Sequence, residues 1–115
     1  MEIINSKNTS FDKLIGIQDG LLKKSQARQM KFTEDSDKYR FEESKQIDIL
    51  FEKRELLHAQ ANAIRASMRE FNIESDELDA MLVGLGQTYD EFTQEIQNKR
   101  IKLVNSDLEE FSTKV

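Results

Sequence analysis

The most regular pattern in this sequence is a stripe of apolar residues that recurs every third or fourth position between residues 47 and 71. This spacing places the side chains on one face of a helix and is typical of coiled-coil packing. The stripe has one polar member and consists of Ile47, Leu50, Arg54, Leu57, Ala61, Ile64, Met68 and Phe71. We therefore predict a long helix over about residues 34–71.

A second stripe follows after a short polar break. Ser75 is a good helix N-cap, and acidic residues after it favour the positive end of the helix dipole. The second stripe also has one polar member and consists of Leu78, Leu82, Leu85, Tyr89, Phe92, Ile96, Lys99 and Leu103. It predicts a helix over about residues 76–113. Beyond it the spacing shifts by one residue to Val104, Leu108, Phe111 and Val115, which predicts a kink near Asn105.

Two long stripes joined by a short turn favour an antiparallel helical hairpin. Facing residue numbers should then sum to about 147, from the symmetry of such a hairpin. This register puts Arg54 near Glu91 and Glu95, and Lys99 near Asp48. The long aliphatic stems of Arg and Lys can line the seam while their charges stay at its edge.

The N-terminal third gives a weaker helical signal. We expect a flexible segment over residues 1–9 and a helix over about residues 10–31, with Thr33 as the N-cap of the next helix. Gly16 and Gly20 each cost this helix about 1 kcal/mol relative to Ala. The predicted fold is therefore all-α: a long antiparallel helical hairpin with a shorter N-terminal helix packed at its base. Residues 10–115 form a single helical domain.

Composition narrows the possible functions. Charged residues make up 34% of the 115 residues, and the chain has no Pro, Trp or Cys. The absence of Cys excludes disulfides and thiolate chemistry. A net charge of −5 argues against binding of nucleic acid, which needs a basic face. No apolar run approaches a membrane span, and the first residues lack the pattern of a secretory signal, so we expect no membrane association and a cytoplasmic location.

The pattern also predicts where a partner could bind. If the first helix covers only the base, the far end of the hairpin has two helices and cannot bury all its apolar surface. Small residues there, including Gly84 and Gly86, fit either tight packing within the hairpin or a groove for a partner helix. The candidate partner-binding residues are Leu57, Ala61, Ile64, Met68, Leu78, Met81, Leu82 and Leu85.

A metal site is a weaker alternative. Glu55 and His58 have the Glu-x-x-His spacing found in carboxylate-bridged di-iron bundles, and a homodimer could supply the second pair. Both residues flank the seam, however, and therefore point sideways. We expect no metal, no cofactor and no catalytic residue, because the single His has no nucleophile motif beside it.

These observations favour a non-catalytic helical module for protein–protein interaction, such as an adaptor, a chaperone-like protein or an assembly subunit. Self-association is the simplest way to complete an incomplete bundle, so a homo-oligomer is expected. Two alternatives remain: a homodimeric carboxylate/His metal-binding bundle, and an inhibitor or regulator that binds a host protein.

Overall fold

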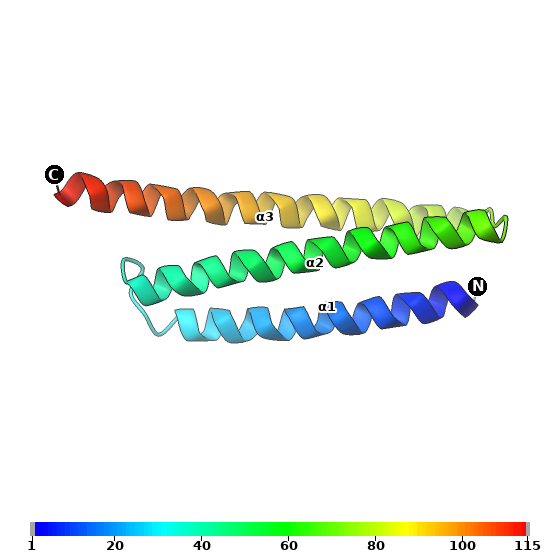
Figure 1. Cartoon of the computed structure of the whole chain (residues 1–115), viewed down its shortest axis with the longest axis horizontal. Coiled ribbons are helices and arrows are strands. Elements are labelled where there is room, and N and C mark those ends of the chain that lie inside the picture. Colours follow the sequence, from blue (N-terminus) through cyan, green and yellow to red (C-terminus); the bar gives the residue numbers. More distant parts are fainter. Residues whose placement is uncertain (1, 115) are drawn as a thin grey trace.

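The computed structural model describes the backbone of residues 2–114 and the side chains of residues 2–105. It contains three helices: α1 (Glu2–Gln29), α2 (Asp37–Glu70) and α3 (Asp76–Lys114). They form an elongated body of 64 × 23 × 17 Å (Figure 1). The all-α class, the long antiparallel hairpin of α2 and α3, and the shorter N-terminal helix are confirmed.

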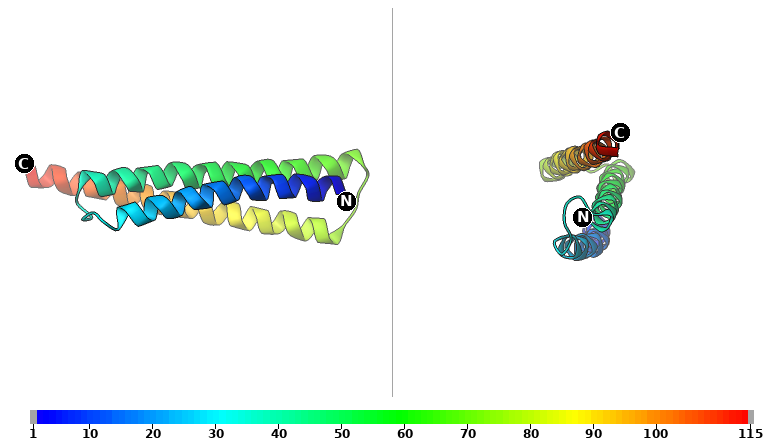
Figure 2. Two further views of the ribbon diagram at one scale, coloured as in Figure 1. Left: turned by 90° about the horizontal axis from the view of Figure 1, so that it is seen from below. Right: turned by 90° about the vertical axis from the view of Figure 1, so that its left-hand side faces the viewer.

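The middle helix, α2, holds the molecule together. Both α1 and α3 pack along it. Toward the base they lie on opposite sides of α2, whereas at the tip α1 lies beside both other helices (Figures 1 and 2). Among the described residues, no Cα atom of α1 lies within 8 Å of a Cα atom of α3, but at the tip Asn8 donates to the Sδ of Met81 at 3.4 Å. The fold is therefore an open layer of three helices toward the base and a three-helix bundle at the tip.

Local sequence explains where α2 and α3 begin. The Oγ of Ser36 accepts a hydrogen bond from the backbone N–H of Tyr39 at 3.1 Å, so Ser36 caps α2 in place of the predicted Thr33. The Oγ of Ser75 accepts from the N–H of Leu78 at 3.2 Å and caps α3 as predicted. Between the two helices, Asn72 has a φ of 50°, a left-handed conformation that Asn tolerates better than most residues.

The first helix differs from the prediction. It begins at Glu2, so residues 2–9 are helical, and it runs along the whole hairpin instead of covering only the base. Near the turn between α2 and α3, Ile4 packs with Ile64 and Leu78, and all three side chains are 1% exposed. The prediction of a two-helix tip was wrong, because α1 supplies the third side of its core.

A second apolar cluster lies nearer the other end. Ile47, Leu50 and Ile96 are buried there, with Leu22 of α1 packed against them. The hairpin register agrees with the prediction at Arg54, whose guanidinium donates to the Oγ1 of Thr93 at 3.3 Å.

Two further expectations at the base need correction. Lys99 bonds to Glu43 and Gln46, and not to Asp48. The helix α3 continues through Asn105 without the predicted break. Phe41, a large aromatic residue of α2 at this end, is 64% exposed. Val104 is also exposed, whereas the predicted stripe members Leu108, Phe111 and Val115 lie outside the residues whose side chains are described.

Candidate interaction surface

The residues predicted to bind a partner at the tip face the interior of the chain. Four are buried and four are half-buried around the cluster of Ile4, Ile64 and Leu78. The buried ones are Leu57, Ala61, Ile64 and Leu78, and the half-buried ones are Met68, Met81, Leu82 and Leu85. Their role in binding stays a prediction, and it would require α1 to move away from the tip.

The small residues at the tip do not mark a close helix approach. A Cβ atom placed on Gly84 or Gly86 would have no neighbour within 4 Å. A small hollow of about 70 Å³ lies beside them, lined by Leu57, Ala61 and Leu85 among others. The interpretation of these glycines as a site of tight packing within the hairpin is therefore wrong.

Polar contacts hold α1 on α2. The apolar stripes in the sequence did not predict these contacts. Hydrogen bonds and ion pairs join α1 to α2 near the tip, at Asp19 and near the base. The contacts join Lys7 to Ser67 (3.1 Å), Asn8 to Gln60 (3.1 Å), Asp19 to Lys53, and Arg28 to Glu42 (2.9 Å). The sequence does contain a signal for this interface. It is a stripe of polar residues on α2 that has the same helical spacing as the apolar seam beside it.

The densest part of this polar interface surrounds Glu42, whose side chain is almost fully buried. Arg28 donates to its Oε1 at 2.9 Å, and Ser25 donates to its Oε2 at 2.6 Å. These hydrogen bonds, from Arg28 first and Ser25 second, hold the pKa of Glu42 below its usual value of 4.5. The buried carboxylate therefore stays charged and paired.

Glu43, the next residue, joins all three helices. Its carboxylate accepts hydrogen bonds from Gln29 of α1 and, at 3.0 Å, from Lys99 of α3. Burial raises the pKa of Glu43, but the bonds from Gln29 and Lys99 outweigh that effect and leave the pKa below 4.5. This interaction fixes the order of the helices at the base.

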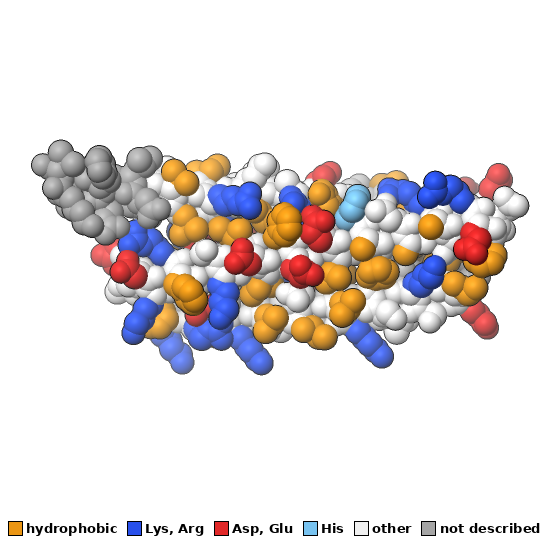
Figure 3. All heavy atoms as spheres, in the orientation of Figure 1, with side chains coloured by type: hydrophobic (Ala, Val, Ile, Leu, Met, Phe, Trp, Pro, Cys, Tyr) orange, Lys and Arg blue, Asp and Glu red, His pale blue; other side chains and the backbone are white. Residues whose placement is uncertain are grey.

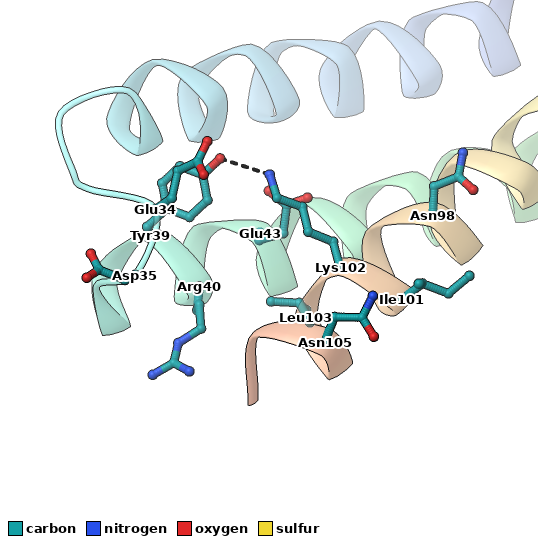
Figure 4. Close-up of a pocket in the computed structure, with 10 residues that line it drawn as sticks. All are labelled: Glu34, Asp35, Tyr39, Arg40, Glu43, Asn98, Ile101, Lys102, Leu103 and Asn105. Carbon is teal, nitrogen blue, oxygen red and sulfur yellow. Dashed lines mark hydrogen bonds between the residues drawn. The ribbon is translucent and has the colours of Figure 1, made fainter. Parts of the chain in front are cut away.

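An open hollow of about 490 Å³ lies between the start of α2 and the C-terminal part of α3 (Figure 4). In it, Lys102 donates from Nζ to the Oη of Tyr39 at 3.2 Å, and this bond raises the pKa of Lys102. Acidic Glu34 and Asp35 and basic Arg40 also line it. Since both signs of charge are mixed there, the hollow selects no class of ligand.

The candidate metal ligands Glu55 and His58 have other partners. A carboxylate oxygen of Glu55 lies 3.5 Å from a guanidinium nitrogen of Arg54. His58 shares a 3.3 Å hydrogen bond with Asn62, and its ring lies 6.0 Å from that of Tyr89. In the part of the chain that the structure describes, no three His, Asp or Glu side chains gather as a metal site would require.

Apolar side chains on the outside are the most unusual feature of the surface. Within residues 2–105, eleven large hydrophobic side chains are exposed, whereas the buried core contains nine hydrophobic and eight polar or charged residues. The exposed set comprises Ile3, Leu14, Ile17, Leu21, Met30, Phe41, Phe51, Phe71, Val83, Ile101 and Val104. Figure 3 shows such side chains between charged ones on one face.

Comparison with known proteins adds no functional assignment. No family model, curated protein or solved structure matches this chain. Among the described residues, no helix has both the length and the apolar character that crossing a membrane requires. The surface itself must therefore support any proposal of function.

Proposed function

We propose that this chain is a non-catalytic helical module that works by binding protein, as an adaptor, a chaperone-like protein or an assembly subunit. The observation that carries the proposal is the surplus of exposed large hydrophobic side chains over buried ones among the described residues. The proposal includes the cytoplasmic location expected from the sequence.

The energetic argument is direct. Each square ångström of apolar surface that leaves water contributes about 25 cal/mol, so a partner that covers several of these side chains gains substantial binding energy. The residues lie on all three helices of a rod 64 Å long. A partner can therefore contact this chain over a long distance, as helices do in coiled-coil assemblies.

An inhibitor or regulator that binds a host protein belongs to the same physical class, and the same surface supports it. No specific observation favours the metal-binding alternative, since Arg54 and Asn62 are the closest polar partners of its two candidate ligands. We therefore keep protein binding as the single proposal.

Site-specific photo-crosslinking in the native cell tests it. A benzophenone amino acid replaces Ile17 on α1 or Ile101 on α3, which are 60% and 58% exposed. Glu52, an exposed polar position on α2, serves as the control. We expect a defined protein adduct at one or both apolar positions and little at position 52. Absence of protein adducts at both apolar positions, with the chain folded and expressed, would contradict the proposal.

A further inference from the structure

The residues of α1 that face α2 recur strictly at every third or fourth position. This spacing identifies the residues on the opposite side of the helix. The inward residues are buried or half-buried and comprise Ile4, Asn8, Phe11, Ile15, Gln18, Leu22, Ser25 and Gln29. The exposed side of α1 contains five cations, Lys7, Lys13, Lys23, Lys24 and Arg28, and two acids, Glu2 and Asp12. It also contains all the exposed large hydrophobic residues of α1, which are Ile3, Leu14, Ile17 and Leu21. We name this side the cationic edge.

The outward side of α3 has the opposite charge. Its inward seam runs from Leu78 to Leu103, and its exposed charges up to Asn105 are six acids and two cations, Arg100 and Lys102. Four of the acids, Asp76, Glu77, Asp90 and Glu91, face away from the seam. The three exposed hydrophobic residues of α3, Val83, Ile101 and Val104, lie on the same side. We name this side the anionic edge.

Few of these charges have partners inside the chain. Within residues 2–105, none of the four acids of the anionic edge forms an ion pair. On the cationic edge, Arg28 pairs with Glu42 and Lys7 donates to Ser67, whereas Lys13 and Lys24 have no partner in the same range. Figure 3 shows basic side chains projecting along the α1 side of the molecule. Both edges therefore carry charge available to a partner.

We infer that the cationic edge of one copy packs along the anionic edge of a second copy. The inference rests on the proposed protein-binding function and names the partner. It is argued from charge complementarity, because two surfaces of one sequence combine exposed apolar residues with charges of opposite sign. An anionic membrane or a nucleic acid would satisfy the cationic edge alone and would repel the other edge of a chain whose net charge is −5.

The two edges are different surfaces of the same chain, so the contact is head-to-tail. A head-to-tail contact leaves one edge of each kind free, and association continues into a ring or a filament. The assembly should grow with protein concentration and weaken with added salt, because exposed charges are screened.

Charge reversal tests the inference by light scattering across a concentration series. One variant, K13E/K24E, reverses two charges of the cationic edge. A second, D90K/E91K, reverses two charges of the anionic edge. The control, D48K/E52K, makes the same change of charge as the second variant at exposed positions of α2. Circular dichroism confirms that each chain is helical before its mass is compared.

We expect the wild type and the control to associate and each edge variant to remain monomeric. An equimolar mixture of the two edge variants should recover the large assemblies. In an alternating array every second contact is the wild-type contact, and the others bring the introduced glutamates against the introduced lysines. A small fraction of K13E/K24E added to the wild type should shorten the assemblies, since it can occupy a growing end but cannot extend it. A wild type that stays monomeric, or a mixture that does not recover, overturns the inference.

Two measurements keep this inference separate from the proposed function. A monomeric wild type that forms photo-adducts with a different protein would overturn self-association and leave protein binding standing. A monomeric wild type without adducts at either edge would contradict both. A third outcome is that a monomeric wild type co-sediments with phosphatidylglycerol vesicles and K13E/K24E does not. That result would assign the cationic edge to a lipid surface and overturn the inference.

Discussion

Lys99 of α3 and Glu43 of α2 form a buried ion pair, with 3.0 Å between Nζ and Oε1 and with side chains 18% and 5% exposed. Because Gln29 of α1 donates to the other oxygen of the same carboxylate, this one group connects all three helices. Gln46 also accepts from Lys99, at 3.0 Å.

Replacing Lys99 should destabilise the fold more than replacing an exposed lysine. In K99M the carboxylate of Glu43 loses its cation while it remains buried, and such a loss costs about 2–4 kcal/mol. The free energy of unfolding from urea titration measures the effect. K23M, at an exposed position of α1 without an ion pair among the described residues, is the control and should change that free energy by less than about 0.5 kcal/mol.

Acid should weaken the interface of α1 and α2 through Glu42 and Glu43. Both carboxyls have pKa values below 4.5 in the folded chain. The unfolded chain therefore takes up protons first as the pH falls. The resulting stabilisation is fully present above pH 4.5 and is lost as the pH falls through the lowered pKa values. We expect wild type to exceed E42Q/E43Q in free energy of unfolding at neutral pH, and the gap to close in acid. A gap that stays constant would contradict this assignment.

Gly16 and Gly20 should be replaceable by Ala with a gain in stability. A Cβ at either position meets nothing within 4 Å, and neither glycine has a positive φ. Ala in place of Gly inside a helix contributes about 0.5–1 kcal/mol per site. Thermal unfolding of G16A, G20A and the double variant measures this, and the two gains should add. A lower melting temperature would show that these positions contact something other than solvent.

The tip core should be sensitive to a cavity. Ile64→Ala removes a side chain that is 1% exposed and packed against Ile4 and Leu78, which costs about 2–4 kcal/mol. Val83→Ala, at a position 61% exposed, should change the free energy of unfolding of the monomer little. Equal effects of the two substitutions in chemical denaturation would mean that the core is elsewhere.

The hairpin was predictable and the position of α1 was not, for the same physical reason. Apolar stripes such as the one from Ile47 to Met68 reveal a seam because burial of apolar surface drives the pairing. The interface of α1 with α2 depends instead on residues such as Ser25, Gln29 and Gln46, all buried. In a sequence these residues resemble a solvated surface, since only the structure shows that their hydrogen bonds go to one another.

The candidate surface was missed for a related reason. An exposed Leu14 or Ile17 is indistinguishable in a list of apolar residues from a half-buried Ile15 or Leu22. The missing information was which apolar residues share a helical face with Lys13 and Lys24. Once the spacing from Ile4 to Gln29 identifies the inward face, the sequence alone shows that cations outnumber acids on the exposed side of α1 and that acids outnumber cations on that of α3.

The open layer also affects how the chain unfolds. If α1 detaches, the tip cluster loses Ile4 and the base cluster loses Leu22, but each cluster keeps the members that α2 and α3 supply. The hairpin can therefore outlast its first helix, and α1 forms a separate cooperative unit with a lower opening free energy. Backbone amides of α1 should then exchange with solvent deuterium sooner than those at the centres of α2 and α3.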